Sequence, residues 1–255
     1  MYDSANFKLN DQVALITGAG AGIGRAIAET FAAAGAAVMV SDLNVESAQS
    51  VATAIQTQGG RAEAMACDVT KEEDLLRLVE ETVQRLGKLT VLVSNAGGGG
   101  PKPFDMPMAD FRRAFDLNVF SLFRLAQLAA PKMESVGGGV MLAITSMAGE
   151  NKNTRMAAYG SSKAATNHLI RNIAFDLGPK GIRINGIAPG ATRTAALESV
   201  LNDDIEKAML MHTPIRRLGE PQDMANAALY LCSPAASWVS GQILTVSGGG
   251  VQELD

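Results

Sequence analysis

The chain has 255 residues, of which 47% are hydrophobic and 19% charged, a composition typical of one globular domain. Its net charge of −4, without a Lys/Arg cluster, argues against nucleic-acid binding, and no apolar run reaches the roughly 20 residues that span a bilayer. Two cysteines and two histidines are too scattered for a disulfide framework or a metal site, and the first ten residues lack a signal peptide's apolar core. We therefore expect a cytoplasmic protein without a metal.

Short apolar runs alternate with helical patterns along the chain. The first run, 13–16, leads through a glycine-rich turn into an alanine-rich helix at 25–34. We expect further strands at 37–40, 62–67, 89–93, 140–144, 182–187 and 243–246. We expect further helices at 45–58, 71–86, 108–133, 154–177 and 221–231, with a mobile helical flap at 193–212. The alternation predicts one α/β Rossmann domain over 1–255, a doubly wound seven-stranded parallel sheet with helices on both faces.

Glycines mark the turn between the first strand and its helix. Gly18, Gly22 and Gly24 allow close approach of the backbone to a pyrophosphate, which the following helix N-terminus also favours. Asp42 ends the next strand, and a carboxylate there suits the ribose diol of NAD. No Arg or Lys stands in 41–46 to receive the 2′-phosphate of NADP. The pattern predicts NAD, against the alternatives of a packing turn and a solvated strand-end acid.

Tyr159 and Lys163 stand four residues apart in a predicted helix, so they share one face. A nearby ammonium lowers the pKa of a phenol, which then exchanges a proton with an alcohol near neutral pH. Ser146 lies thirteen residues before Tyr159, at the end of a predicted strand. The Tyr/Lys spacing alone is common by chance, so it predicts chemistry only together with the nucleotide turn.

These features together resemble the short-chain dehydrogenase/reductase family. The resemblance rests on the Thr-Gly-x-x-x-Gly-x-Gly form of 17–24, on Asn95-Ala-Gly97, and on Asn118, Ser146, Tyr159 and Lys163. It extends over residues 13–249. One departure is Ser94, which replaces the asparagine more usual before Asn95.

The resemblance implies a role for each matching residue. Tyr159 is the general acid/base, Ser146 polarises the substrate oxygen, Lys163 holds the nicotinamide ribose, and Asn118 supports a water in a proton relay. Asp68 meets the adenine amino group. The implied cofactor residues are Gly18, Gly22, Ile23, Gly24, Asp42, Asp68, Val69, Asn95, Gly97, Tyr159, Lys163, Pro189, Gly190, Thr192 and Thr194. Structural alternatives are a helix N-cap for Ser146, backbone pairing for Asn118 and a surface position for Lys163.

Five segments outside these motifs resemble the bacterial hydroxysteroid dehydrogenases of the family. They are 97–113, 150–153, 212–219, 233–241 and 247–254. The resemblance implies NAD-dependent oxidation of the 7α-hydroxyl of bile acids such as cholate and chenodeoxycholate. It also implies substrate contacts from Gly99, Ser146, Asn151 and Tyr159. The match is weakest at 193–211, and the alternatives are another short-chain oxidoreductase, such as a 3-oxoacyl-thioester reductase, or a scaffold that lost its chemistry.

Two further expectations concern partners. Arg193 or Lys102 would meet the carboxylate tail of a bile acid, unless these cations are simply solvated. The long helices carry apolar residues on faces that a monomer leaves uncovered, for example at 119–123 and 169–173. With the family resemblance, these faces imply a homotetramer.

Overall fold

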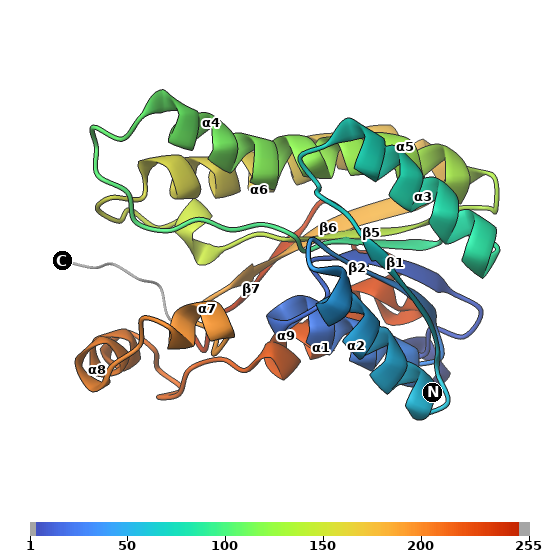
Figure 1. Ribbon diagram of the computed structural model, residues 1–255, viewed down its shortest axis with the longest axis horizontal. Helices are drawn as coiled ribbons and strands as arrows, with labels where there is room; N and C mark the ends of the chain where they lie inside the picture. The colour runs from blue at the N-terminus through green and yellow to red at the C-terminus, as the bar shows by residue number, and fades with distance from the viewer. Residues whose placement is uncertain (1–3, 250–255) are drawn as a thin grey trace.

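The computed structural model describes residues 4–249, which form a parallel sheet with helices on both sides (Figure 1). The strand order is β3-β2-β1-β4-β5-β6-β7, so the direction of winding reverses between β1 and β4. The strands span Val13–Thr17 (β1), Ala37–Asp42 (β2), Arg61–Ala66 (β3), Val91–Ser94 (β4), Gly139–Ile144 (β5), Ile182–Pro189 (β6) and Ile243–Val246 (β7). The predicted doubly wound seven-stranded sheet is confirmed.

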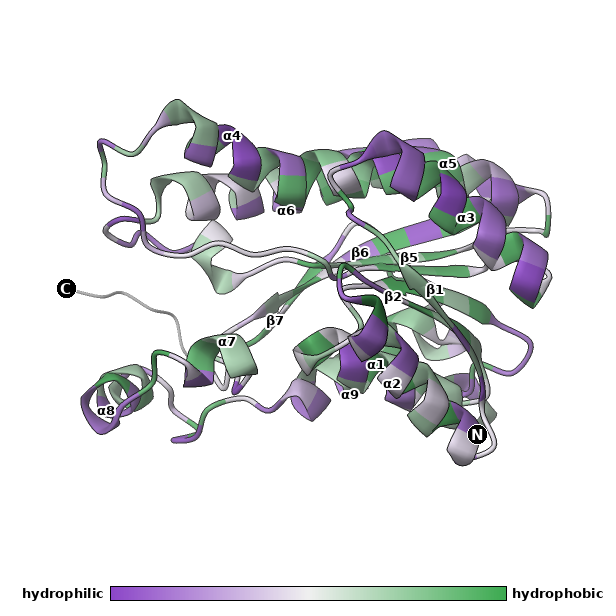
Figure 2. Cartoon of the chain, viewed as in Figure 1, coloured by the Kyte–Doolittle hydropathy of each residue, from purple (hydrophilic) through white to green (hydrophobic). Residues whose placement is uncertain are grey.

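Each face of the sheet has its own apolar core. One core lies under α1 (Gly22–Ala33), α2 (Val45–Thr57) and α9 (Pro221–Cys232), and the other under α3 (Glu72–Leu86), α5 (Ser121–Glu134) and α6 (Ala157–Leu177) (Figure 1). Every residue of β1 is buried, as in a strand covered on both faces. Figure 2 shows hydrophobic residues along the central strands and hydrophilic residues on the outer surface of α3.

The segment predicted as one helix at 108–133 contains an irregular turn. α4 (Met108–Phe115) is followed by a π-helical turn at Asp116–Phe120, and α5 then continues to Glu134. Such single π turns interrupt α-helices mostly at functional sites. This one carries Asn118, whose side chain is buried.

The predicted flap consists of two short helices, α7 (Ala195–Glu198) and α8 (Asp203–Met211). Neither helix has a buried residue. Side chains cap both N-termini, since Thr194 accepts from the backbone N–H of Leu197 and Asn202 from that of Ile205. In Figure 1 these helices lie beyond the carboxyl ends of the strands, with α4 on the other side of that edge.

Both long helical segments carry exposed apolar side chains, including Phe175 of α6, but only one of the two expected examples is among them. Phe120 and Phe123 are 58% and 42% exposed. The second example was wrong, because Ile170 and Ile173 of α6 are buried in the core. Gly186 of β6 explains the burial of Ile170, since a Cβ there would stand 3.0 Å from the Cδ1 atom of Ile170.

The carboxyl ends of parallel strands meet at one edge, where ligands of this architecture bind. Thr17, Asp42, Ser94, Ile144 and Pro189 end their strands at that edge. Between residues 4 and 249, no helix combines the length and apolarity that crossing a membrane requires.

Candidate active site

The glycine turn after β1 packs too tightly for side chains. Gly18 and Gly22 have φ of 61° and 54°, which favours glycine. A Cβ on Gly24 would overlap the carbonyl oxygen of Gly18, so the first turn of α1 lies directly against the loop. A Cβ on Gly18 would stand 2.9 Å from the Cα atom of Ala96, which follows β4. The turn therefore presents bare backbone at the N-terminus of α1, a site suited to phosphate.

Asp42 lies beside this loop. Its Oδ2 atom accepts a hydrogen bond from the N–H of Gly20 at 2.9 Å, and its Oδ1 atom accepts from Asn44 at 3.0 Å. The carboxylate is therefore held at the end of β2 next to the glycine turn. Its charge opposes a phosphate at the same place, as the sequence predicts for NAD over NADP.

Asn95 fastens the end of β4 to the same loop. Its Nδ2 atom donates to the carbonyl oxygens of Thr17 and Gly18, each at 2.9 Å. The hydroxyl of Thr17 accepts from the N–H groups of Asn95 and Ala96 at 3.2 and 3.1 Å. The neighbouring Ser94 is buried at the strand end. Because Asn95 and Thr17 make the bonds of this network, a serine in place of asparagine at 94 removes none of them.

Ser146 and Tyr159 meet beyond the end of β5. The Ser146 hydroxyl accepts from the N–H of Ala148 at 3.1 Å, which caps the short helix Met147–Gly149. Its interaction with the Tyr159 side chain favours a lower pKa of that phenol. The serine is therefore an N-cap and a partner of the tyrosine at once, and the cap fixes where its hydroxyl lies.

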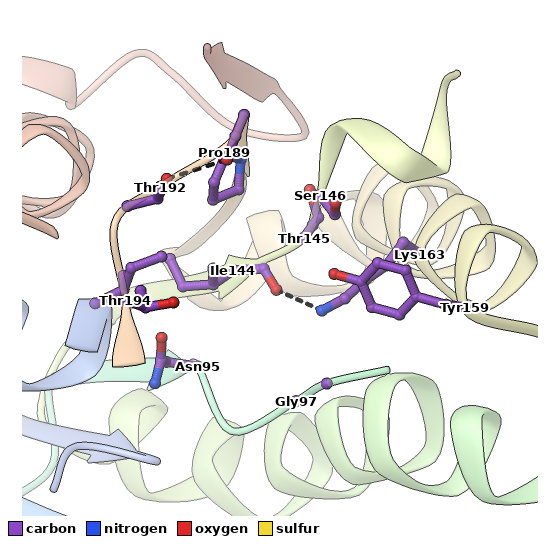
Figure 3. A pocket seen from close by; sticks show the side chains of 13 residues that line it. Asn95, Gly97, Ile144, Thr145, Ser146, Tyr159, Lys163, Pro189, Thr192 and Thr194 are labelled. Carbon is purple, nitrogen blue, oxygen red and sulfur yellow. Dashed lines mark hydrogen bonds between the residues drawn. The ribbon is translucent and has the colours of Figure 1, made fainter. Parts of the chain in front are cut away.

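Burial is the main cause of the pKa shifts of Tyr159 and Lys163. It raises the pKa of Tyr159, while the interaction with Ser146 acts in the opposite direction. Burial also lowers the pKa of Lys163 from 10.5 to about 8. The Lys163 Nζ atom donates to the carbonyl oxygen of Ile144 at 2.9 Å (Figure 3), and a lowering of the Tyr159 pKa by Lys163 stays a prediction.

Asn118 connects the π turn to the loop after β4. Its Oδ1 atom accepts from the N–H of Gly98 and its Nδ2 atom donates to the carbonyl of Gly98, both at 3.0 Å. The same Nδ2 atom donates to Ser162 at 3.0 Å, and Thr166 donates to the Asn118 carbonyl at 3.1 Å. The backbone-pairing alternative is thus present, and it positions the loop beside Tyr159 and Lys163.

Gly99 lies against the ring of Tyr159. Its φ of 141° is one that L side chains rarely adopt, and a Cβ there would stand 2.6 Å from the Cδ2 atom of Tyr159. A Cβ on Gly97 would stand 2.8 Å from the Asn118 Oδ1 atom. The glycine run after β4 therefore supports the tyrosine ring from one side.

A cavity of about 310 Å³ joins these parts at the carboxyl edge of the sheet (Figure 3). Ten predicted site residues line it: Ile23, Asn95, Gly97, Ser146, Tyr159, Lys163, Pro189, Gly190, Thr192 and Thr194. Gly98, Ile144 and Thr145 also line it and were not among the predicted site residues. Gly98 and Thr145 are next to predicted site residues in the chain, and Ile144 is the last residue of a predicted strand.

The other predicted residues surround the cavity without lining it. Gly18, Gly22, Gly24, Asp42 and Asn118 act through the contacts described above, and Gly99 supports Tyr159. Asp68 accepts from the N–H and hydroxyl of Thr70, and these bonds lower the pKa of its carboxyl. Val69 is buried beside it. The Nδ2 atom of Asn151 is buried without a hydrogen-bond partner in the structure.

The two cations considered for a carboxylate tail are already paired. Arg193 contacts Glu206 at 2.7 Å, and Lys102 contacts Asp110 at 3.1 Å. Within residues 4–249, no three His, Cys, Asp or Glu side chains are grouped so that they could hold a metal ion.

Comparison with known proteins places this site in a family. A family model described as enoyl-(acyl carrier protein) reductase matches residues 18–250. A solved short-chain type dehydrogenase/reductase from Mycobacterium marinum is 36% identical, with a TM-score of 0.90 over 95% of this chain and 96% of that one. The chain belongs to the short-chain dehydrogenase/reductase family.

Two comparisons show more similar members of the short-chain dehydrogenase/reductase family. The 7α-hydroxysteroid dehydrogenase of Escherichia coli K12 is 66% identical over the full length of both chains. A solved 7α-hydroxysteroid dehydrogenase in complex with NADH and 7-oxo glycochenodeoxycholic acid is also 66% identical, with a TM-score of 0.98 over both complete chains.

The residues present fit the dinucleotide that enzymes of this family use. Gly18 and Gly24 of the glycine turn have room only for backbone, the Asp42 carboxylate is fixed beside the turn, and the cavity continues to Tyr159 and Lys163. A nucleotide laid along this edge has its phosphates at the glycine turn and its reactive ring near the tyrosine.

Proposed function

We propose that this protein is an NAD-dependent 7α-hydroxysteroid dehydrogenase. It oxidises the 7α-hydroxyl of bile acids such as cholate and chenodeoxycholate to the 7-oxo form. The observation that carries the proposal is the 66% identity, over both full lengths, to an enzyme solved with NADH and a 7-oxo bile acid. The site geometry supports the same chemistry, because Ser146 and Tyr159 both line the wall of one cavity together with Lys163.

The proposed cofactor site follows the carboxyl edge of the sheet. The glycine turn with Ile23 receives the pyrophosphate, and Asp42 accepts from the adenosine ribose. Asp68, Val69, Asn95 and Gly97 border the adenosine. The nicotinamide end is held by the remaining proposed contacts, Tyr159, Lys163, Pro189, Gly190, Thr192 and Thr194. When bound, NAD supplies the acceptor for the hydride that leaves C7 of the steroid.

The protein's own residues manage the proton. Tyr159 takes the proton of the substrate hydroxyl as general base, and Ser146 donates to the substrate oxygen as it becomes a carbonyl. The N-cap bond from Ala148 holds the Ser146 hydroxyl in place for this task. Burial raises the pKa of Tyr159, so deprotonation in this site needs stabilisation beyond what the side chains alone provide.

Lys163 and a water held near Asn118 carry the proton away from Tyr159. Burial lowers the Lys163 pKa to about 8, so its amine accepts and releases a proton near physiological pH. Asn118 holds the loop at Gly98 that borders this path, and a water near it completes the relay. The pair therefore links the buried tyrosine to solvent.

The proposed steroid site lies between the loop after β4 and the flap. Gly99, Ser146, Asn151 and Tyr159 contact the steroid, and the flap at 193–212 covers it. The buried, unpaired Nδ2 atom of Asn151 supports this role, since such a donor requires a partner.

We also propose one domain over 1–255, a homotetramer, and a cytoplasmic location. The exposed rings of Phe120 in the π turn, Phe123 on α5, Phe175 on α6 and Trp238 are surfaces that a second copy would cover. A monomer in sedimentation at micromolar concentration would contradict the assembly.

The proposal is tested by identifying the product. Purified protein is incubated with cholate and NAD, and the steroid is analysed by mass spectrometry with a 7-oxo standard. A product two hydrogens lighter that co-elutes with the 7-oxo standard supports the proposal. Unchanged cholate, or oxidation at the 3- or 12-hydroxyl, contradicts it.

A further inference from the structure

Arg193 lies between two residues of the cavity wall but faces away from it. Thr192 and Thr194 line the cavity on either side of Arg193 in the chain. In extended backbone, successive side chains point to opposite sides. The guanidinium accordingly lies outside the cavity, where it meets two carboxylates.

These two carboxylates come from different parts of the chain. The Nη2 atom of Arg193 is 2.7 Å from the Oε1 atom of Glu206 in α8, and its Nε atom is 3.6 Å from the Oε1 atom of Glu220, which precedes α9. The Arg193 and Glu206 side chains are only about one-third exposed, at 35% and 31%. The arginine thus joins α8 to the segment that borders the cofactor site.

The backbone beneath the arginine is fixed independently of its side chain. The N–H of Arg193 donates to the carbonyl of Gly219 at 2.7 Å, and the N–H of Gly219 donates to the carbonyl of Ala191 at 2.9 Å. The Cγ2 atom of Thr194 would lie 3.4 Å from a Cβ on Gly22, so this segment also borders the phosphate loop. Its position does not depend on α8.

Apart from this ion pair, α8 is held by polar contacts at its ends, where Asn202 caps the first turn and Arg216 donates to the carbonyl of Leu210 at 3.0 Å. None of its residues is buried, in contrast to α6 or α9. Glu206, Met209 and Leu210 form its half-buried side, while Asp203, Asp204, Ile205, Lys207 and Ala208 are exposed. A helix with so few buried contacts opens readily unless polar contacts hold it.

We propose that Arg193 is a positioning residue that ties α8 over the steroid site, through Glu206, to the backbone that holds the nicotinamide end of NAD. The substrate part of this inference rests on the proposed function. The ion pair determines the fraction of time for which α8 covers the steroid site, and it does not alter the cofactor-binding site. The arginine therefore acts on steroid affinity without touching the steroid.

The opposite role, a direct contact between Arg193 and the carboxylate tail of a bile acid, makes a different prediction. Removing Glu206 would then free the arginine and strengthen steroid binding. If Arg193 instead positions α8 through Glu206, removing Glu206 weakens steroid binding as much as removing Arg193 does. The two single variants therefore separate the roles.

The test compares Arg193→Gln, Glu206→Gln, the double variant and Arg193→Lys with the native protein. We expect each single glutamine variant to raise the steroid KM roughly five-fold, the range that a partly exposed ion pair supports. The double variant should be no worse than either single one, and Arg193→Lys should restore most of the affinity. NADH affinity, measured by fluorescence titration, should stay within about two-fold. Arg217→Gln is the matched control, since it breaks the 2.6 Å pair with Asp223 away from α8.

A steroid KM that falls in Glu206→Gln, or that rises only for substrates with a charged tail, would overturn the tie. Hydrogen exchange of the α8 amides in the protein without ligands tests it separately. Faster exchange at 203–211 is expected in both glutamine variants and not in Arg217→Gln. Unchanged exchange overturns the tie even if 7α-hydroxysteroids are substrates. Faster exchange without steroid turnover keeps the tie and rejects the proposed function.

Discussion

The Nζ atom of Lys163 donates to the carbonyl oxygen of Ile144 at 2.9 Å, although Tyr159 stands one helical turn away. The ring centroid of Tyr159 is 5.8 Å from that nitrogen. The lysine is thus anchored to the end of β5, and burial dominates the pKa of both groups. Both polar groups are therefore held in a buried site, and their burial has measurable consequences.

Lys163 makes stability depend on pH. Its pKa falls from 10.5 to about 8 on folding, so the native state resists protonation and the penalty is complete below pH 8. The penalty disappears as pH rises through the window from 8 to 10.5, and its full size is roughly 3 kcal/mol. Lys163→Met should therefore unfold at a higher free energy than the native protein at pH 7, with the difference shrinking toward pH 10.5 in urea titrations. Lys207→Met, at an exposed position of α8, is the control; a difference independent of pH would contradict the account.

Tyr159→Phe should bind NADH normally and lose turnover. The phenol of Tyr159 is the proposed general base. Such a group contributes about 10²–10⁴-fold to the rate. Steady-state kinetics and NADH fluorescence measure the two properties separately. A variant that keeps near-native kcat would remove Tyr159 from the mechanism.

Gly99→Ala should impair catalysis by moving the Tyr159 ring. A Cβ at Gly99 would stand 2.6 Å from the Cδ2 atom of Tyr159, and φ there is 141°. Gly100→Ala is the matched control, because a Cβ at Gly100 meets nothing within 4 Å. We expect kcat to fall at least about ten-fold in the first variant, as for other small misplacements of a reacting group, and to stay near native in the second. Equal effects of the two changes would count against the close contact.

Asp42→Asn should weaken the preference for NAD. The amide removes the charge that repels a 2′-phosphate; its one oxygen still accepts from Gly20, and the bond from the N–H of Asn44 is lost. The ratio of kcat/KM with NAD to that with NADP should fall by about ten-fold or more, as expected when one close charge is removed. Glu46→Gln serves as the control on the first turn of α2. An unchanged ratio in Asp42→Asn would place cofactor selection elsewhere.

The strands and the nucleotide turn could be predicted because local pattern and tertiary structure agree there. Buried parallel strands read as continuous apolar runs, and the close approach at Gly18 and Gly24 leaves glycine as the fitting residue. The π turn at Asp116–Phe120 could not be predicted, since nothing in its residues breaks the helical pattern. It depends on contacts with α6, such as the bond from Thr166 to the Asn118 carbonyl.

The pKa shifts and side-chain orientations of the site were less predictable from the sequence than the identities of its residues. Helical spacing brought Tyr159 and Lys163 to one face, but the direction of the lysine depends on a carbonyl of β5, far away in sequence. The pairing of Arg193 likewise depends on how α8 folds back. Burial and orientation arise from tertiary packing, so motif spacing gives the residues of a site and not their pKa values.

The central claim is most directly tested by NADH formation with four bile acids. Cholate and chenodeoxycholate carry a 7α-hydroxyl, deoxycholate has no 7-hydroxyl, and the 7β epimer of chenodeoxycholate presents it on the other face of the steroid. The account predicts turnover of the first two only. Equal turnover of all four, or of none, would contradict it.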